Sequence, residues 1–229
     1  VSLNCPVLST LLFTPHEVYQ QQITAQSKGM HTVELPDGST LSVNANTRLR
    51  IDFDSHQRRI FLERGQFYVE VAPDKERPMW VQTGDATVRV VGTGFDVRRT
   101  DQQLVVSVAH GQVAFAPDKR APLLLGAQQQ VAVDLASGDM QQQTLAVSQV
   151  ADWRSGHLSF RNRELSSLVD ELNQYRAKPV LLANAKLGQI KVSGNLDVED
   201  PDALISALPA LIPVKTVALA DGRIRIENR

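Results

Sequence analysis

The stretch His31-Thr32-Val33-Glu34-Leu35-Pro36-Asp37-Gly38-Ser39-Thr40-Leu41-Ser42-Val43 decides the fold of the first half of this chain. Apolar and polar residues alternate on both sides of Asp37-Gly38, and an Asp-Gly pair between two such runs is the strongest short-range signal of a β-hairpin. Similar short runs, cut by turn residues, continue from Gly29 to Gln130 with almost no helical periodicity. We predict strands at 31–35, 40–43, 48–53, 59–63, 66–71, 79–83, 86–91, 95–99, 104–109, 112–116 and 131–133.

So many short strands predict an all-β domain, either a solenoid-like stack or a sandwich, because each ribbon can bury its apolar face only against another. We favour the stack. Glutamines at 128–130 and 141–143 flank the last expected strand, and the polar stretch 137–149 indicates the approach to a domain boundary near Ala151. We therefore divide the chain into domains at 1–151 and 152–229.

After Trp153 the pattern changes to strands alternating with helices. We expect Asn162 to cap a helix whose apolar stripe has helical spacing, and Asp200-Pro201 to begin a second helix. The stripe consists of Leu165, Leu168, Val169 and Leu172, and strands are expected at 158–160, 180–182, 190–196, 214–219 and 223–226. The sum is a βαβ unit, a second βαβ unit and a closing strand, which together predict one small sheet with two helices.

Composition excludes several classes of protein. The chain has 229 residues, a net charge of -1 and 42% hydrophobic residues, which argues against a disordered tail and against a nucleic-acid partner. Its only cysteine is Cys5, so the chain cannot form an internal disulfide or a thiolate metal cluster. No apolar run approaches the roughly 20 residues of a membrane-spanning helix. Because the chain begins at Val1, we expect any targeting or membrane segment to lie upstream.

Candidate chemistry is sparse. The histidines are His16, His31, His56, His110 and His157, and no pair of them has the spacing of metal ligands on a helix. We predict no metal and no cofactor. A Ser-His-Asp triad stays open because its members can come in any order, although there is no Gly-x-Ser-x-Gly motif. Gly92-Thr93-Gly94 precedes an expected strand rather than a helix, which favours a tight turn over a phosphate loop.

Several of these motifs, in this order and spacing, resemble the periplasmic β domain of FecR-type transmembrane sigma-factor regulators, which are anti-sigma factors. The resemblance covers residues 29–130 and departs only at Met79-Trp80, where phenylalanine is more usual. It rests on Val33–Ser39, Leu62–Phe67, Arg77–Val81, Val91–Val97 and Val106–Val113. The stretch Trp153–Phe160, with Leu165 and Asn173–Arg176, is similar to the family's C-terminal region, which resembles the short N-terminal signalling domain of secretins and TonB-dependent transporters.

The resemblance, nearest to regulators of the PupR type, implies a non-enzymatic signalling region. It would lie in the periplasm as part of a single-pass inner-membrane protein, with the membrane reached through an absent upstream helix. Its partner would be the N-terminal signalling domain of a TonB-dependent siderophore transporter. An absent cytoplasmic region would hold an extracytoplasmic-function sigma factor that controls iron-uptake transcription. The alternative is a β module that binds envelope glycan or peptidoglycan without a signalling role.

Two sets of candidate site residues follow. Some FecR-like regulators cut themselves at a Gly-Thr bond, and Gly92-Thr93 matches it, so partial self-cleavage is the one covalent reaction we expect. For partner binding we expect an unpaired edge strand in the C-terminal domain, which can accept a strand from another protein. Our candidates are the strands that carry Ile190 and Val192, and Arg223 and Arg225.

Overall fold

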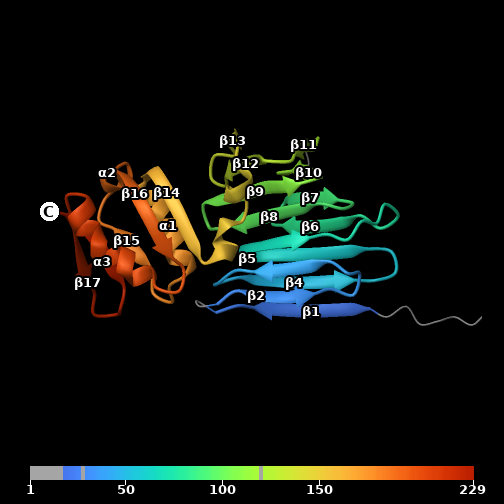
Figure 1. Cartoon of the computed structure of the whole chain (residues 1–229), viewed down its shortest axis with the longest axis horizontal. Coiled ribbons are helices and arrows are strands. Elements are labelled where there is room, and N and C mark those ends of the chain that lie inside the picture. The colour runs from blue at the N-terminus through green and yellow to red at the C-terminus, as the bar shows by residue number, and fades with distance from the viewer. Residues whose placement is uncertain (1–17, 27–28, 119–120) are drawn as a thin grey trace, which may run out of the picture.

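The computed structural model describes residues 18–26, 29–118 and 121–229, so Cys5 and His16 lie outside the described residues. A β domain is followed by a smaller domain of strands and helices (Figure 1). The chain is thus mainly β, as the sequence predicts. None of the helices in the described ranges is long and apolar enough to span a membrane.

The β domain is one 13-stranded sheet that curls over, so that two layers face each other across an apolar core. One layer runs in the order β1-β4-β5-β6-β7-β10-β11 and the other in the order β2-β3-β5-β8-β9-β12-β13. The strands lie one above another from β1 to β13 (Figure 1). Their bounds are β1 Tyr19–Thr24, β2 His31–Glu34, β3 Thr40–Val43, β4 Arg48–Phe53, β5 Arg58–Glu70, β6 Met79–Thr83, β7 Ala86–Val90, β8 Gly94–Arg99, β9 Gln103–His110, β10 Gln112–Ala116, β11 Leu123–Gly126, β12 Gln129–Asp134 and β13 Met140–Thr144.

Strand β5 belongs to both layers, and Gly65 makes this possible. The first half of β5 pairs with β4 and β6, and the second half pairs with β3 and β8. Gly65 has φ +94°, and a Cβ there would lie 2.4 Å from the Cα of Thr47. Only glycine fits this crossing. The sequence analysis broke β5 into two strands at this glycine, which is wrong because the pairing continues through it.

The predicted hairpin is confirmed, and its turn is tied into the core. β2 and β3 pair with Glu34 opposite Thr40, and Gly38 adopts φ +83°. Asp37 accepts hydrogen bonds from Ser39 and from the buried guanidinium of Arg58, which lies 2.7 Å away. Three strands were missed, namely β1, β11 and β13. β13 falls within the polar stretch that the sequence analysis assigned to a domain boundary, because none of its residues is buried.

The C-terminal domain follows two short 3-10 turns, η1 (Val147–Gln149) and η2 (Asp152–Ser155). It contains two small sheets rather than the expected single sheet: β14 pairs with β16, and β15-β18-β17 form the other. Helix α1 contacts β14 and β15, and α3 contacts β16 and β17, so both helices bridge the two sheets. The bounds are β14 His157–Glu164, α1 Leu165–Gln174, β15 Val180–Leu182, α2 Ala185–Gly188, β16 Lys191–Asp197, α3 Pro201–Leu211, β17 Val214–Ala218 and β18 Ile224–Asn228.

The two predicted helix caps have different outcomes. Asp200 caps α3, because its carboxylate accepts from the backbone N–H of Ala203, as expected. Asn162 does not cap α1. It lies in a bulge of β14 with φ +51°, and its backbone N–H donates to the Ser193 hydroxyl, so the strand continues to Glu164 before the helix begins.

Candidate functional site

The two domains share a joint that is partly apolar. Tyr68 on β5 and Ala45, just after β3, belong to the same buried cluster as Trp153, Leu172 and the rest of the C-terminal core. The guanidinium of Arg154 lies 4.2 Å above the ring of Tyr68. Because a β-domain residue takes part in the second core, the two domains are held together by burial and not only by the chain between them.

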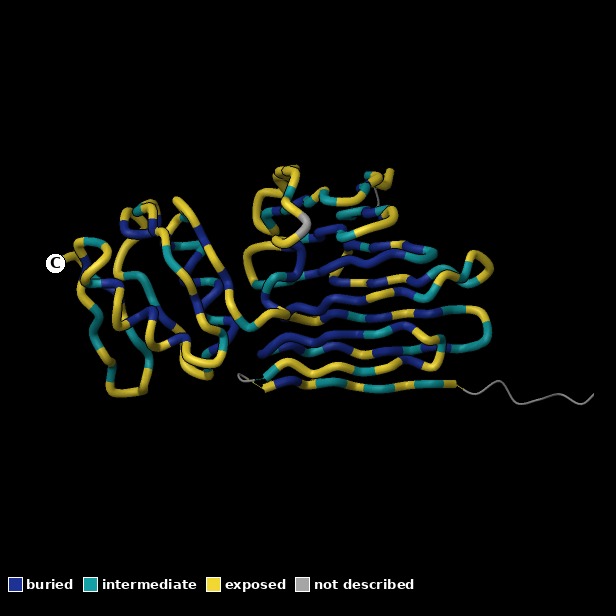
Figure 2. The backbone as a smooth tube through the Cα atoms, viewed as in Figure 1, coloured by how far each residue is buried: buried dark blue, intermediate teal, exposed yellow. Residues whose placement is uncertain are grey.

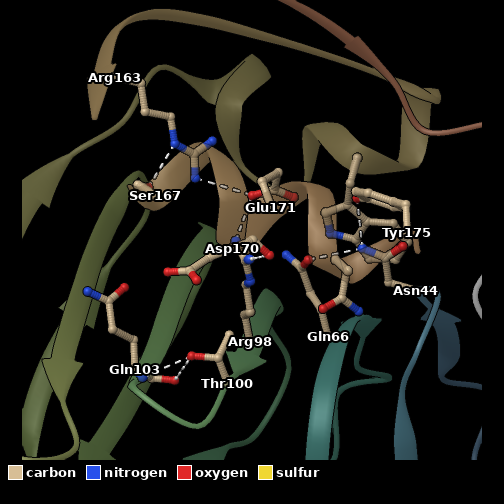
Figure 3. A network of polar contacts seen from close by, with 12 residues as sticks. Asn44, Gln66, Arg98, Thr100, Gln103, Arg163, Ser167, Asp170, Glu171 and Tyr175 are labelled. Atoms are coloured by element: carbon tan, nitrogen blue, oxygen red, sulfur yellow. Dashed lines mark hydrogen bonds and ion pairs between the residues drawn. The ribbon is translucent and has the colours of Figure 1, made fainter. Parts of the chain in front are cut away.

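A buried ion-pair network crosses this joint (Figure 3). Arg98 on β8 donates to the carboxylate of Glu171 on α1 at 2.6 Å and to the carbonyl of Asp170 at 3.1 Å. Arg163 on β14 reaches the same Glu171 oxygen at 3.2 Å. Burial pushes the pKa of Glu171 up, but the two guanidinium groups outweigh it and hold this pKa below its usual range. Glu171 is thus a charged group whose partners come from both domains.

A second contact joins Asp96 on β8 to the linker. The Asp96 carboxylate accepts from the indole N–H of Trp153 at 2.8 Å and from the side-chain amide of Gln66 at 2.9 Å. Burial raises the pKa of Asp96 to about 6, although both hydrogen bonds and the nearby Arg98 act to lower it. Asp96 therefore changes its charge close to neutral pH, at the point where the linker leaves the β domain.

The turn after β3 binds the end of helix α1. Asn44 donates its side-chain amide to the hydroxyl of Tyr175 at 3.1 Å (Figure 3), and the side chain of Gln174 donates to the carbonyl of Ala45. The Asn46 amide lies 3.0 Å from the carbonyl oxygen of Gln174 and donates to it. Helix ends leave carbonyl groups without partners, so this turn acts as a C-terminal cap supplied by the other domain.

A polar groove of about 1000 Å³ lies beside the joint, with walls from both domains. Its floor is the outer face of β8, β9, β12 and β13, which carries side chains such as Gln103, Gln130 and Gln143. The opposite wall comes from η2, β14 and α1 and includes Asp152 and Arg161. Burial raises the pKa of Asp152 to about 6. Four glutamines lie on the floor, namely Gln103, Gln130, Gln141 and Gln143, and their side-chain amides can both donate and accept hydrogen bonds.

The prediction that the strand at Arg223–Ile226 lies at an edge of its sheet is wrong. β18 is the central strand of its sheet, because it pairs with β15 on one side and with β17 on the other. Arg223 and Arg225 form ion pairs with Asp221 at 2.7 Å and Glu227 at 2.5 Å. The sequence analysis missed the parallel pairing with β15, which joins segments that are far apart in the chain.

Four strands of the C-terminal domain have one side without a strand partner in the described part of the chain, namely β14, β15, β16 and β17. β16 pairs only with β14, and the bond from Leu165 N–H to the Ile190 carbonyl shows that Ile190 and Val192 face this partner. The outward N–H and C=O groups of β16 are therefore those of Lys191, Ser193 and Asn195, rather than those of Ile190 and Val192.

Another free side belongs to β17, the strand farthest from the β domain (Figure 1). Leu219 N–H donates to the Arg223 carbonyl at 2.8 Å, and Arg229 N–H donates to the Pro213 carbonyl at 3.4 Å. By alternation, the main-chain groups of Thr216 and Ala218 point away from β18. The outer side of β15 differs, because the Asn173 side chain bonds both the N–H and the carbonyl of Val180.

Gly92-Thr93 lies between β7 and β8 and is packed tightly. Thr93 is 1% exposed, and its hydroxyl donates to the carbonyl of Gln112 at 2.9 Å. A Cβ on Gly111 would lie 2.9 Å from that hydroxyl, so the chain leaves little room around it. Neither Gly92 nor Thr93 has a positive φ. The hydroxyl would have to leave Gln112 before it could attack the Gly92 carbonyl.

The histidines are dispersed over the described residues. His31 begins β2, His56 lies in the turn before β5, and His157 lines the groove. His110 pairs with Glu70 at 2.7 Å. Within the described ranges, no group of three His, Cys, Asp or Glu residues could hold a metal ion.

The sequence analysis missed the joint altogether. In the sequence, four residues of the joint look like ordinary polar residues that face solvent, because nothing around them departs from the pattern of a strand, turn or amphipathic helix. They are Asn44, Asp96, Arg98 and Glu171. One signal was available: Arg98 and Asp96 both fall on the outward face of a strand whose inward residues are Phe95 and Val97. In the structure Phe95, Asp96 and Val97 are buried and Arg98 is half-buried, so both faces of this strand are covered.

Comparisons with known proteins agree with this architecture. Residues 21–114 match the sequence model of the family described as FecR protein. Two crystal structures, at 2.50 and 1.65 Å resolution, of a candidate anti-sigma factor from Parabacteroides distasonis are similar to the chain. Each is 24% identical to it, with TM-scores of 0.79 and 0.80, and they cover 92% and 91% of this chain and 100% and 99% of their own. At this identity the likeness concerns the fold, across both domains. Among curated proteins, none matches the sequence significantly.

Proposed function

Since residues 21–114 form a FecR-type domain, we infer that this chain is the periplasmic sensing region of a transmembrane anti-sigma regulator. The C-terminal domain binds the N-terminal signalling domain of a TonB-dependent siderophore transporter. This binding controls an extracytoplasmic-function sigma factor that is held on the cytoplasmic side. The sigma factor in turn controls the transcription of iron-uptake genes. No step of this function requires catalysis or a cofactor.

The observation that carries the proposal is the combination of a fixed joint with free strand sides. The joint ties the C-terminal domain to the FecR-type domain through Glu171, Asp96 and the cap on α1. The outer sides of β16 and β17 have no strand partner among the described residues. A strand from another protein can bond such a side through its main chain. The domain is therefore built to accept a partner and to move together with the β domain.

The test is a calorimetric titration of the whole chain with transporter signalling domains. Thr216→Pro removes an outward N–H of β17 and leaves the ladder to β18 intact, and Asn195→Pro does the same for β16. The matched controls are Thr216→Ala and Asn195→Ala, which keep the N–H. Asn195→Ala also reports the loss of the bond from Ser159, which is 2.7 Å long.

One proline variant should lose at least about tenfold in affinity while its alanine control binds normally, since one charge-free main-chain bond is worth about 1 kcal/mol and proline also blocks close approach. If both proline variants bind like wild type, the partner does not dock on the outer side of β16 or β17. If the wild-type chain binds no transporter signalling domain, the proposed function itself is wrong.

The second candidate function is binding of envelope glycan, and the polar groove favours it. Its amide-lined floor could bond sugar hydroxyls, but Trp153 and Phe160 at its wall are buried and offer no exposed ring for stacking. A glycan array on the whole chain separates the two functions. Specific retention of a peptidoglycan fragment, lost in Gln130→Ala, would support this candidate over transporter signalling.

A further inference from the structure

Strand β13 closes the upper end of the β domain with an unusual edge. It consists of Met140-Gln141-Gln142-Gln143-Thr144 and pairs only with β12, in unbroken register. All five residues are exposed, as Figure 2 shows for this end of the domain. A strand that buries no side chain is stabilised mainly by its ladder to one neighbour, which is marginal in water.

The edge also lacks the usual protection against strand addition. Natural edges carry charges, prolines or bulges. β14 has a bulge and three charged residues, β17 carries Lys215, and the side chain of Asn173 covers the outer side of β15. β13 has no charged residue, no proline and no register shift. Glutamine rows, moreover, can stack amide on amide along paired strands.

The hydrogen-bond pattern of β13 makes its free side self-complementary. Leu145 N–H donates to the Gln128 carbonyl and Asp134 N–H to the Asp139 carbonyl. By alternation, residues 141 and 143 bond β12, whereas the N–H and C=O groups of Met140, Gln142 and Thr144 point outward. An antiparallel copy centred on Gln142 would place Gln142 opposite its counterpart and Met140 opposite Thr144.

The side chains fit the same pairing. Gln143 donates to Gln130, and Gln130 donates to the hydroxyl of Ser107 at 2.7 Å, which forms a polar row across β13, β12 and β9. In the antiparallel arrangement Gln141 of one copy would lie beside Gln143 of the other, on the same face as this row. No charged pair opposes contact, because Asp139 would lie opposite Leu145.

We propose that the β domain dimerises through β13, which pairs antiparallel with β13 of a second copy around a two-fold axis at Gln142. Such an interface is isologous and closed, the commonest symmetry of homo-oligomers. Five residues on each side bury little area, so the dimer is weak in solution and depends on concentration. In each copy, β13 belongs to one of the two layers, and the pairing joins these layers from the two copies into one continuous sheet. The polar grooves of the two copies then lie side by side.

The test begins with sedimentation equilibrium of the whole chain over a concentration series. Wild type should show a monomer-dimer equilibrium, and Gln142→Pro should stay monomeric, because it removes an outward N–H but no bond to β12. Gln141→Lys/Gln143→Lys and Gln141→Glu/Gln143→Glu should each be monomeric alone, yet associate when mixed. Circular dichroism of each variant checks that the β domain is folded.

Cross-linking fixes the register. In a Cys5→Ser background, Gln142→Cys should form a disulfide dimer on mild oxidation, since directly opposed hydrogen-bonded residues lie about 5.5 Å apart, within disulfide range. Gln22→Cys, on the equally uncharged edge strand β1, is the matched control and should stay monomeric. A wild-type chain that is monomeric at every concentration, or cross-linking at Gln22→Cys instead of Gln142→Cys, would overturn the proposal.

Discussion

Glu171→Gln is the most informative perturbation of the joint. Glu171 is 8% exposed and is the shared partner of Arg98, which is 13% exposed, and of Arg163. Removing the negative charge leaves the Arg98 guanidinium buried without its counter-charge. Breaking a buried pair in this way costs about 3–5 kcal/mol. Since Arg98 lies on β8 and Glu171 on α1, this free energy should be lost from the contact between the domains.

The assay is urea unfolding followed by tryptophan fluorescence and by far-ultraviolet circular dichroism. Trp153 lies buried in the joint, whereas Trp80 lies on β6, far from it in sequence and 39% exposed. In wild type we expect one transition, because Tyr68 of the β domain belongs to the second core. In Glu171→Gln the joint should open first, so the Trp153 signal should change at a lower urea concentration than the far-ultraviolet circular dichroism of the β domain.

Two controls make this prediction refutable. Glu63→Gln breaks the exposed pair between Arg48 and Glu63, 3.2 Å apart, which should be worth only about 0–1 kcal/mol. Arg98→Met/Glu171→Leu removes both charges and should recover most of the stability, because an apolar replacement of a buried pair is often neutral. If Glu171→Gln unfolds like Glu63→Gln, in one transition at nearly wild-type stability, the network does not hold the domains together.

Three further outcomes are expected. Because burial raises the pKa of Asp96 to about 6, the folded protein binds this proton more tightly than the unfolded chain, so stability should rise by about 1 kcal/mol as pH falls from 7 to 5; Asp96→Asn should flatten this slope in urea titrations. Gly65→Ala should lower the melting temperature and cost more than about 1 kcal/mol, because of the positive φ and the contact with Thr47; unchanged thermal unfolding would contradict the account of β5. On prolonged incubation, intact mass spectrometry should reveal at most a minor fragment cut at Gly92-Thr93, absent from Thr93→Ala; identical spectra would eliminate self-cleavage.

Local chemistry made much of the β domain predictable. Asp37-Gly38 specifies a tight turn by itself, and alternation marks strands wherever one face is buried, as at Arg48–Phe53. β13 escaped because a strand with no buried face has no apolar alternation to detect. Gly65 misled for the opposite reason: glycine usually ends a strand, but here it lets one strand pass from one layer to the other.

The joint and the free edges could not be predicted, because they depend on contacts between residues that are far apart in the sequence. Arg98 and Glu171 are 73 positions apart, and nothing near either residue indicates the other. The central place of β18 follows from its parallel pairing with β15, more than forty residues earlier, by the strand bounds. Main-chain alternation then decides which residues of β16 face outward, and this shifts the candidates from Val192 to its neighbours Lys191 and Ser193.

The position of β17 has a mechanical consequence. It is the strand most distant from the β domain (Figure 1). The contacts made by Glu171, Asp96 and Asn46, in contrast, join the β domain to η2 and α1. A force applied at β17 would therefore be transmitted through the joint to the β domain. The two domains would move together instead of bending at the linker. Breaking these contacts should leave the C-terminal domain attached mainly through the linker, so a force on β17 would no longer be transmitted to the β domain.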